Sequence, residues 1–251
     1  MSAAQVGLTS RQAHALELDG VSKRFPGTER PVLADATLRI ATGEWVFLVG
    51  RSGAGKSTVL RMLYGAVAPD RGHARVLGTD LASTPHFRVR QQLGLVFQSF
   101  DLLPQKTAFE NVAYGAEILG LSPRGAKARA AAMLEAVGLT YAAARFPRQL
   151  SGGEQQRVGL ARALIHRPPY VLAYEHTGNL DIHAPPANHA IFKRIHDEWS
   201  PTIVIATHSL ELIRWANRRV VRVQDGTLFD EAESSPSGRA SAGVVRPQGT
   251  P

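Results

Sequence analysis

A glycine-rich run between residues 50 and 58 has the composition and spacing of a phosphate-binding loop. It fits the pattern G-x-x-x-x-G-K-[ST], and its members are Gly50, Arg51, Ser52, Gly53, Ala54, Gly55, Lys56, Ser57 and Thr58. The glycines allow backbone N–H groups to face an anion with no Cβ in the way. Lys56 would reach the β- and γ-phosphates of a nucleotide, and the Ser57 hydroxyl would be a ligand of Mg²⁺.

The segments on either side of this P-loop (residues 50–58) are the elements that such chemistry needs. Residues 45–49 are apolar and rich in β-branched and aromatic side chains, which predicts a buried strand. Residues 57–63 predict a helix whose positive N-terminal end faces the phosphates. Strand, loop and helix in this order distinguish the run from a glycine turn that carries a lysine by chance.

A second run lies about a hundred residues further on and predicts a capped helix. It reads L-S-G-G-E-Q-Q over residues 150–156, ahead of a helical pattern over 158–165. Ser151 is a good N-cap, and Glu154 three residues later completes a capping box. Gly152 and Gly153 leave backbone N–H groups able to approach a phosphate held by another chain. The alternative is a well-capped helix start that binds nothing.

Together the two runs resemble the P-loop and the signature motif of the ATP-binding-cassette (ABC) ATPases, over about residues 16–229. In that family the signature of one subunit closes over the ATP of another, which implies a homodimer with two ATPs between the chains. The resemblance also implies further site residues. Phe25 would stack on adenine, Gln98 would contact Mg²⁺ or the attacking water, Glu175 would be the general base, Asp181 would lie in the D-loop, and His208 would contact the γ-phosphate. For Phe25 the alternative is a core phenylalanine.

Tyr174 departs from the family pattern, which has an aspartate (the Walker B aspartate) directly before the catalytic glutamate. Mg²⁺ prefers carboxylates and water, whereas a phenol with an ordinary pKa of about 10 is neutral at pH 7. We therefore expect weaker Mg²⁺ coordination and slower hydrolysis, with ATP binding less affected. Three accounts stay open: a slow or regulatory ATPase, a compensating ligand elsewhere, or an error or inactivating change in the sequence.

The expected fold is α/β: a P-loop NTPase (RecA-like) core with a mainly parallel sheet. Alternating side chains in residues 16–19 and 36–40 add an N-terminal antiparallel β patch. The resemblance and the alanine-rich periodic stretch at 126–137 predict an inserted α-helical subdomain at about 99–155. Around the ABC domain at 15–231 we expect a flexible leader at 1–14 and a disordered tail at 232–251, where Ser, Pro, Gly and Ala dominate.

Composition narrows the partners. The net charge is +8, and the arginines that supply most of the positive charge are scattered and not gathered into one stripe. A nucleic-acid surface, an anionic nucleotide and an anionic membrane surface could each explain this charge, so charge alone does not decide between them. We expect no nucleic-acid partner. The chain has no cysteine, which excludes a disulfide scaffold. No stretch approaches the roughly 18 apolar residues of a membrane span, and residues 1–12 lack the features of a secretory signal. We expect a peripheral protein on the cytoplasmic face of the membrane, attached through a partner.

Within the family, several stretches most resemble the cell-division ATP-binding proteins of the FtsE type. They are residues 43–50, 52–58, 96–104, 146–150 and 177–181. That resemblance implies an integral membrane, FtsX-like subunit docked on the helical subdomain, through which ATP would control cell-wall hydrolysis. Two alternatives are the ATPase subunit of a lipoprotein- or macrolide-type exporter and a non-hydrolysing module that dimerises on ATP. A soluble ABC protein of DNA repair or translation is a third, but the chain has neither two cassettes nor a large coiled-coil insertion.

Overall fold

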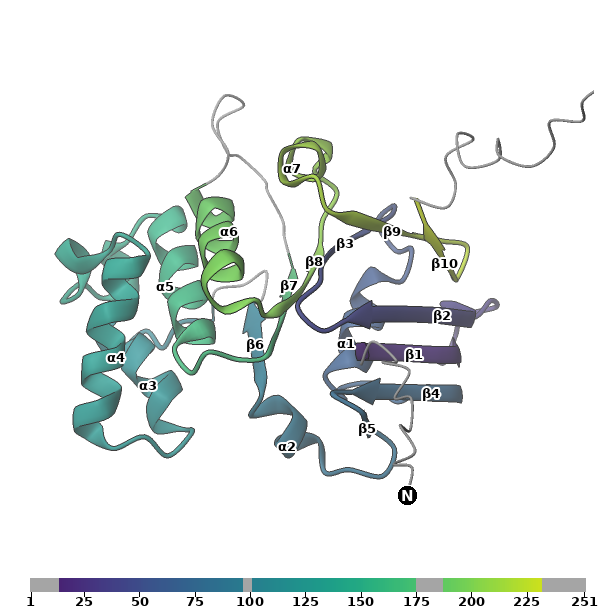
Figure 1. Cartoon of the computed structure of the whole chain (residues 1–251), viewed down its shortest axis with the longest axis horizontal. Helices are drawn as coiled ribbons and strands as arrows, with labels where there is room; N and C mark the ends of the chain where they lie inside the picture. Colours follow the sequence, from purple (N-terminus) through teal and green to yellow (C-terminus); the bar gives the residue numbers. More distant parts are fainter. Residues whose placement is uncertain (1–13, 97–100, 175–186, 232–251) are drawn as a thin grey trace, which may run out of the picture.

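The computed structural model describes residues 14–96, 101–174 and 187–231 (Figure 1). In this part of the chain the strands form two sheets, one of four strands and one of six. The strands are β1 (His14–Lys23), β2 (Leu33–Ala41), β3 (Trp45–Val49), β4 (Arg71–Val76), β5 (Thr79–Asp80), β6 (Leu93–Val96), β7 (Tyr170–Tyr174), β8 (Thr202–Ala206), β9 (Arg219–Gln224) and β10 (Thr227–Asp230).

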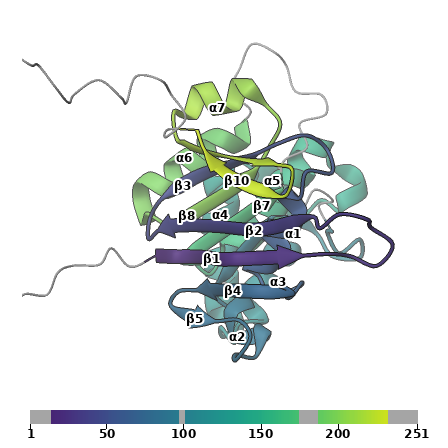
Figure 2. The same cartoon turned by 90° about the vertical axis from the view of Figure 1, so that its right-hand side faces the viewer.

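The four-stranded sheet is antiparallel, in the order β2-β1-β4-β5, as the alternating pattern predicted. Leu16 pairs with Ile40 and Leu18 pairs with Leu38, and all four side chains are buried. Their polar neighbours point to the other face, because successive side chains of a strand alternate between faces. Figure 2 shows this sheet in front of the rest of the molecule.

The six-stranded sheet has the order β10-β9-β3-β8-β7-β6, and its neighbours are parallel from β9 to β6. β10 joins the edge antiparallel to β9. The register brings Leu48 opposite Ala206, Tyr174 opposite Ala206, and Val96 opposite Ala173. The carboxyl ends of four parallel strands therefore meet at one edge, which is where ligands bind in sheets of this kind. The predicted fold class is confirmed.

Seven α-helices and two short 3₁₀ turns connect these strands in the described ranges. They are α1 (Lys56–Leu63), α2 (His86–Arg90), α3 (Ala108–Glu117), α4 (Pro123–Ala136), η1 (Thr140–Ala142), η2 (Pro147–Gln149), α5 (Gly152–Leu164), α6 (Ala187–Trp199) and α7 (Leu210–Ala216). α3, α4 and α5 gather at the end of the molecule opposite the antiparallel sheet (Figure 1). The domain boundaries stay predictions, and α5 spans the one placed near residue 155.

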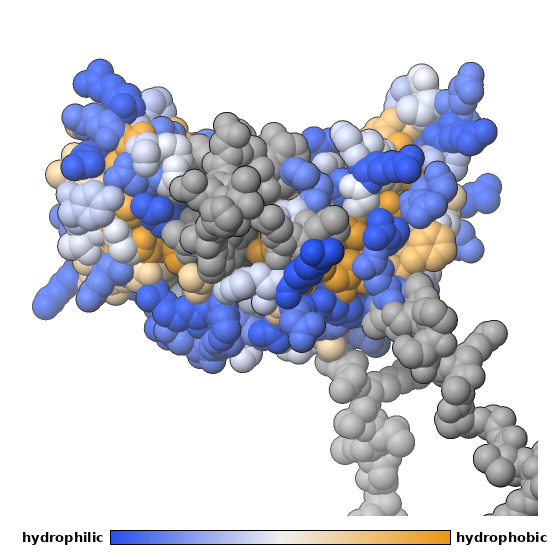
Figure 3. All heavy atoms as spheres, turned by 90° about the horizontal axis from the view of Figure 1, so that it is seen from above, coloured by the Kyte–Doolittle hydropathy of each residue, from blue (hydrophilic) through white to orange (hydrophobic). Residues whose placement is uncertain are grey.

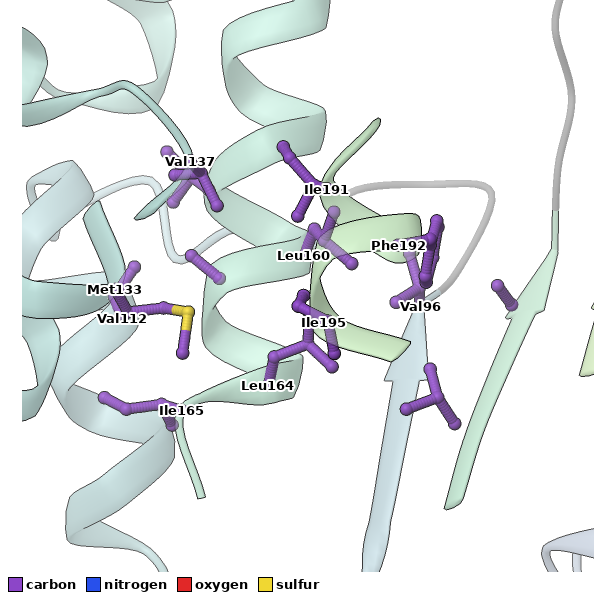
Figure 4. Close-up of a cluster of buried hydrophobic side chains, with 14 of the residues drawn as sticks. Val96, Val112, Met133, Val137, Leu160, Leu164, Ile165, Ile191, Phe192 and Ile195 are labelled. Atoms are coloured by element: carbon purple, nitrogen blue, oxygen red, sulfur yellow. The ribbon is translucent and has the colours of Figure 1, made fainter. Parts of the chain in front are cut away.

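Two buried apolar clusters hold these layers together. One joins the six-stranded sheet to α3–α6, with Val112, Met133, Leu160 and Phe192 among its members (Figure 4). The other fills the space between the two sheets and α1, around Leu16, Leu48 and Leu60. α1 and the P-loop before it are thus fixed between two sheets, which gives the loop a rigid base.

On the face seen from above, hydrophilic residues cover most of the described surface, and apolar residues show only in small areas between them (Figure 3). In the described ranges no helix combines the length and the apolar character needed to span a bilayer.

Candidate nucleotide-binding site

The P-loop begins where β3 ends, and its backbone requires glycine at two positions. Gly50 has φ +153°, and a Cβ there would lie 2.5 Å from the Val223 carbonyl oxygen of β9. Gly55 has φ +107°, and its Cβ would lie 3.1 Å from the Val32 carbonyl oxygen. Any other residue would be strained at these positions, so the two glycines let the loop turn tightly between neighbouring strands.

Lys56 lies inside the curve of this loop. Its ammonium donates to the carbonyl oxygens of Gly50 at 2.7 Å and Arg51 at 3.0 Å. Burial lowers the pKa of Lys56 below its usual value. The two bonds orient the ammonium within the loop, from where it can exchange carbonyl oxygens for phosphate oxygens.

The first turn of α1 supplies further donors to the same place. Gly55 is the N-cap and has no side chain to cap the helix. The first N–H groups of a helix have no intrahelical carbonyl to bind, and the helix dipole makes this end positive. Ser57 is exposed there, whereas Thr58 is buried. Loop, lysine and helix end together fit an anionic phosphate chain.

A cleft of about 680 Å³ runs along the first half of the P-loop. It lies between residues 30–32, residues 50–54 and the β9–β10 turn at 222–226. Its lining includes Arg30, Arg51 and Arg222, the last of which is ion-paired with Glu231. Lys56 and Ser57 are not part of the lining, so the cleft flanks the phosphate loop and does not itself outline the phosphate position.

Phe25 lies in the connection between β1 and β2. Its ring is half-buried and belongs to neither of the buried clusters that the described residues form. The Lys23 ammonium lies 5.7 Å from the ring centroid. The alternative of a core phenylalanine is therefore wrong, while a role in adenine stacking stays a prediction.

Tyr174, the last residue of β7, packs against the start of α1. Its hydroxyl donates to the Ser57 carbonyl oxygen at 3.4 Å. Burial, together with the nearby Tyr64 hydroxyl, raises the pKa of Tyr174 above the ordinary phenol value. The side chain is therefore a neutral phenol beside the residue expected to hold Mg²⁺.

The donors near this position do not make a carboxylate site for Mg²⁺. Within residues 14–96, 101–174 and 187–231, no three His, Cys, Asp or Glu side chains gather in a way that would hold a metal ion. Ser57 offers a hydroxyl and Tyr174 a neutral phenol, and neither replaces the negative charge that a hard cation prefers. Among the described residues the Ser57 hydroxyl is therefore the expected Mg²⁺ ligand, while Gln98 and Glu175 lie outside the described ranges.

His208 follows β8 at the same edge of the sheet. The Thr207 N–H donates to the Leu48 carbonyl oxygen at 3.1 Å, and the Thr207 hydroxyl accepts from the Ser209 N–H at 3.0 Å. These bonds tie the exposed His208 close to the strand that leads into the P-loop. Gln98, Glu175 and Asp181 lie outside the described residues, so their roles stay predictions.

The signature run forms the predicted capping box at the start of α5. The Ser151 N–H donates to Glu154 Oε2 at 2.6 Å, and the Glu154 N–H donates to the Ser151 hydroxyl at 3.3 Å. Ser151 and Gly152 are exposed, and Gly153 is half-buried. The start of α5 is thus ordered and open to an external anion, although its binding role stays a prediction.

Sequence reasoning missed two residues that shape these loops. Asn111 of α3 is fully buried, and its side chain makes four hydrogen bonds to the backbone of residues 103–107. Tyr141 of η1 donates to Glu154 Oε1 at 2.7 Å. The sequence signal that would have identified Asn111 is a polar residue within an apolar helical pattern, whereas no local pattern connects Tyr141 to the signature run.

Comparison with known proteins agrees with this geometry. The sequence pattern of the ABC transporter family matches residues 33–178, more than half of the chain and including the P-loop and the start of α5. This chain belongs to the ABC transporter family. It is therefore an ATP hydrolase of the ABC type, as the sequence predicted.

Three relatives of this ABC ATPase narrow its place in the family. The cell division ATP-binding protein FtsE of Bacillus subtilis is 39% identical over 218 residues, which cover 85% of this chain and 94% of FtsE. The methionine import ATP-binding protein MetN of Nocardia farcinica is 40% identical over 227 residues, 88% of this chain and 68% of MetN. The dimeric structure of the ATP-binding cassette MJ0796 with ADP and Pi is 31% identical, with a TM-score of 0.77, over 86% of this chain and 98% of that one. An importer ATPase was not among the alternatives drawn from the sequence.

Proposed function

We propose that this ABC ATPase works as a homodimer that closes around two ATP molecules. One observation carries the proposal: a single chain presents both a P-loop with a positive helix end and a separate, capped helix start at Gly152 and Gly153, of which Gly152 is exposed. Each would bind one side of a phosphate chain, and a second copy supplies the missing half. The dimeric MJ0796 cassette, which is similar over nearly its whole length, supports this arrangement.

Within each site, Lys56 and the P-loop N–H groups would bind the β- and γ-phosphates. His208, held close to β3, would contact the γ-phosphate, and Phe25 would stack on adenine. Glu175 follows Tyr174 directly in the chain and would activate the attacking water. ATP would act as a bridge between the subunits, and hydrolysis would release them, because a ligand shifts such a balance through its preference for one state.

We infer that Tyr174 slows hydrolysis and affects ATP binding less. The phenol occupies the end of β7 and points its hydroxyl at the Ser57 carbonyl, where the family has a carboxylate. Magnesium would accompany the nucleotide, bound to its phosphates and the Ser57 hydroxyl, without a charged protein ligand from β7. Gln98 is a candidate for a compensating contact. The P-loop donors do not depend on Tyr174, so nucleotide affinity should persist.

The complex that this ATPase would serve is a membrane assembly of the cell-division type, with the chain on the cytoplasmic face. The similarity to FtsE over nearly the whole length of that protein supports this branch. An FtsX-like membrane subunit would then dock on the layer of α3 and α4. A methionine importer is a second candidate, because MetN is 40% identical to this chain, over 68% of its own length. The exporter and the non-hydrolysing module are further alternatives.

ATP-dependent dimerisation tests the proposal directly. The full chain with Glu175→Gln, which should slow turnover, is mixed with ATP and Mg²⁺, and its mass is measured by light scattering. We expect a dimer with ATP and a monomer without it. Lys56→Ala is the control and should remain monomeric with ATP. A Glu175→Gln chain that stays monomeric at saturating ATP would contradict the proposal.

Identifying the membrane protein that co-purifies with the chain distinguishes the cell-division assignment from the importer and exporter alternatives. The tagged chain is purified from its own cells in mild detergent, and the co-purifying membrane protein is identified by mass spectrometry. A permease of the FtsX type supports the cell-division assignment. Recovery of a methionine permease or an exporter permease would contradict the cell-division assignment and support the corresponding alternative.

A further inference from the structure

Tyr141 occupies an unusual place for an aromatic residue. It lies in η1, 64% exposed, so burial of its ring contributes little to its position. Its hydroxyl donates to Glu154 Oε1 at 2.7 Å across a separation of thirteen residues. The hydrogen bond therefore joins the hydroxyl end of this exposed side chain to the start of α5.

The partner of Tyr141 is the glutamate that caps α5. Glu154 Oε2 accepts the Ser151 N–H, while Oε1 accepts the Tyr141 hydroxyl and lies 3.7 Å from a guanidinium nitrogen of Arg145. The Arg145 guanidinium lies 5.4 Å from the Tyr141 ring centroid. Tyr141, Arg145 and Glu154 form a closed cluster, called here the signature brace. The Tyr141 hydrogen bond is the largest of the contacts that lower the pKa of Glu154 to about 2.

The signature brace restrains a carboxylate that would otherwise interfere with phosphate binding at the signature run. An ionised carboxylate at the third position of the helix lies close to the Gly152 and Gly153 N–H groups that would face a phosphate. Two anions close together repel each other, and an unrestrained carboxylate also competes for the same donors. Bonds from Ser151 and Tyr141 occupy both of its oxygens, and Arg145 offsets its charge.

We propose that Tyr141 is a positioning residue of the nucleotide sandwich. By holding the Glu154 carboxylate, it keeps the N-terminus of α5 in the form that accepts the phosphate of a nucleotide bound by a second copy of the chain. The inference rests on the proposed homodimer for its function. Its structural part, the restraint of α5 by Tyr141, also holds in the single chain.

Tyr141→Phe tests the brace, because it removes one hydroxyl and keeps the ring that contacts Arg145. We expect the ATP concentration for half-maximal dimerisation of the Glu175→Gln chain to rise about three- to tenfold, in line with the loss of one ordinary hydrogen bond, because this bond is exposed to solvent. Binding of a fluorescent ATP analogue to dilute monomer should not change, because the P-loop is untouched. Tyr114→Phe on α3, another exposed tyrosine, is the matched control and should leave both quantities unchanged.

A double-mutant cycle shows whether Tyr141 acts through Glu154. Glu154→Gln removes the charge and keeps an acceptor, so adding Tyr141→Phe to it should weaken dimerisation much less than in the parent chain. Equal effects of Tyr141→Phe in both backgrounds would overturn the proposal.

Hydrogen exchange separates this inference from the proposed dimer. In the nucleotide-free chain, the hydrogen-bonded amides of Ser151, Glu154 and Gln155 should exchange several-fold faster in Tyr141→Phe, and at the parent rate in Tyr114→Phe. Unchanged exchange in Tyr141→Phe would overturn the brace, whatever the oligomeric state. If exchange rises but the parent chain never dimerises with ATP, the brace stands as a restraint on α5 and the nucleotide sandwich fails.

Discussion

Asn111 offers a demanding test of how the helical layer is joined to the chain that leads into it. Its side-chain oxygen accepts the Leu103 N–H at 2.8 Å. Its amide nitrogen contacts the carbonyl oxygens of Leu103 at 3.1 Å, Lys106 at 2.9 Å and Thr107 at 3.0 Å. One fully buried amide thus fixes residues 103–107 onto α3.

Asn111→Ala removes all four contacts at once. The Leu103 N–H loses its partner, and a buried donor left unsatisfied costs about 1–3 kcal/mol. With a further contribution from the carbonyl groups, we expect the free energy of unfolding to fall by about 2–4 kcal/mol. For a chain of this size that corresponds to a melting temperature lower by roughly 5–15 °C. Asn111→Asp should cost at least as much, because a carboxylate cannot donate to those carbonyl oxygens.

Urea unfolding followed by circular dichroism measures this loss, and hydrogen exchange at the Leu103 amide locates it. Glu117→Ala, an exposed change on the same helix, is the control and should stay within about 0.5 kcal/mol of the parent. If Asn111→Ala matches Glu117→Ala in stability, and the Leu103 amide stays protected, the side chain does not fix this segment.

Three further predictions concern the nucleotide site and the signature run. Gly50→Ala forces a Cβ to 2.5 Å from the Val223 carbonyl, so it should abolish binding of a fluorescent ATP analogue; unchanged affinity would refute the strain. Lys56→Ala removes a charged donor and should weaken the same binding by about tenfold or more, in a titration where a smaller loss would contradict its role. Glu154 has its pKa lowered from 4.5 to about 2, so its ionised form stabilises the fold above pH 4.5, and this contribution is lost as the pH falls toward about 2. Unfolding curves of the parent and Glu154→Gln should therefore differ at pH 7 and converge near pH 2; a constant difference would count against the assignment.

The sequence was sufficient to predict the elements whose formation depends on residues close together in the chain. The apolar strand before Gly50 and the capping pattern of Ser151 and Glu154 predicted β3 and α5 because strand burial and helix capping depend on residues close in the chain. Alternation in β1 and β2 likewise predicted their antiparallel pairing.

The contacts that join distant segments could not be predicted in the same way. Tyr141 meets Glu154 because η1 and α5 come together in the fold, and Tyr174 meets Ser57 across a separation of 117 residues. The sequence identified Tyr174 as a departure from the family pattern. It did not reveal that the phenol would donate to the P-loop helix, since that depends on how β7 and α1 pack.

Steady-state ATPase activity with Mg²⁺ tests the central claim, that Tyr174 limits hydrolysis while binding persists. Tyr174→Asp restores the family carboxylate, and Tyr174→Phe is the matched control that removes the hydroxyl without adding a charge. We expect Tyr174→Asp to raise the turnover rate about tenfold or more, which means that the activation barrier falls by at least about 1.4 kcal/mol. Glu175→Gln should abolish turnover. Tyr174→Phe should stay as slow as the parent, and all four chains should bind ATP. A parent chain that turns over as fast as Tyr174→Asp would contradict the account.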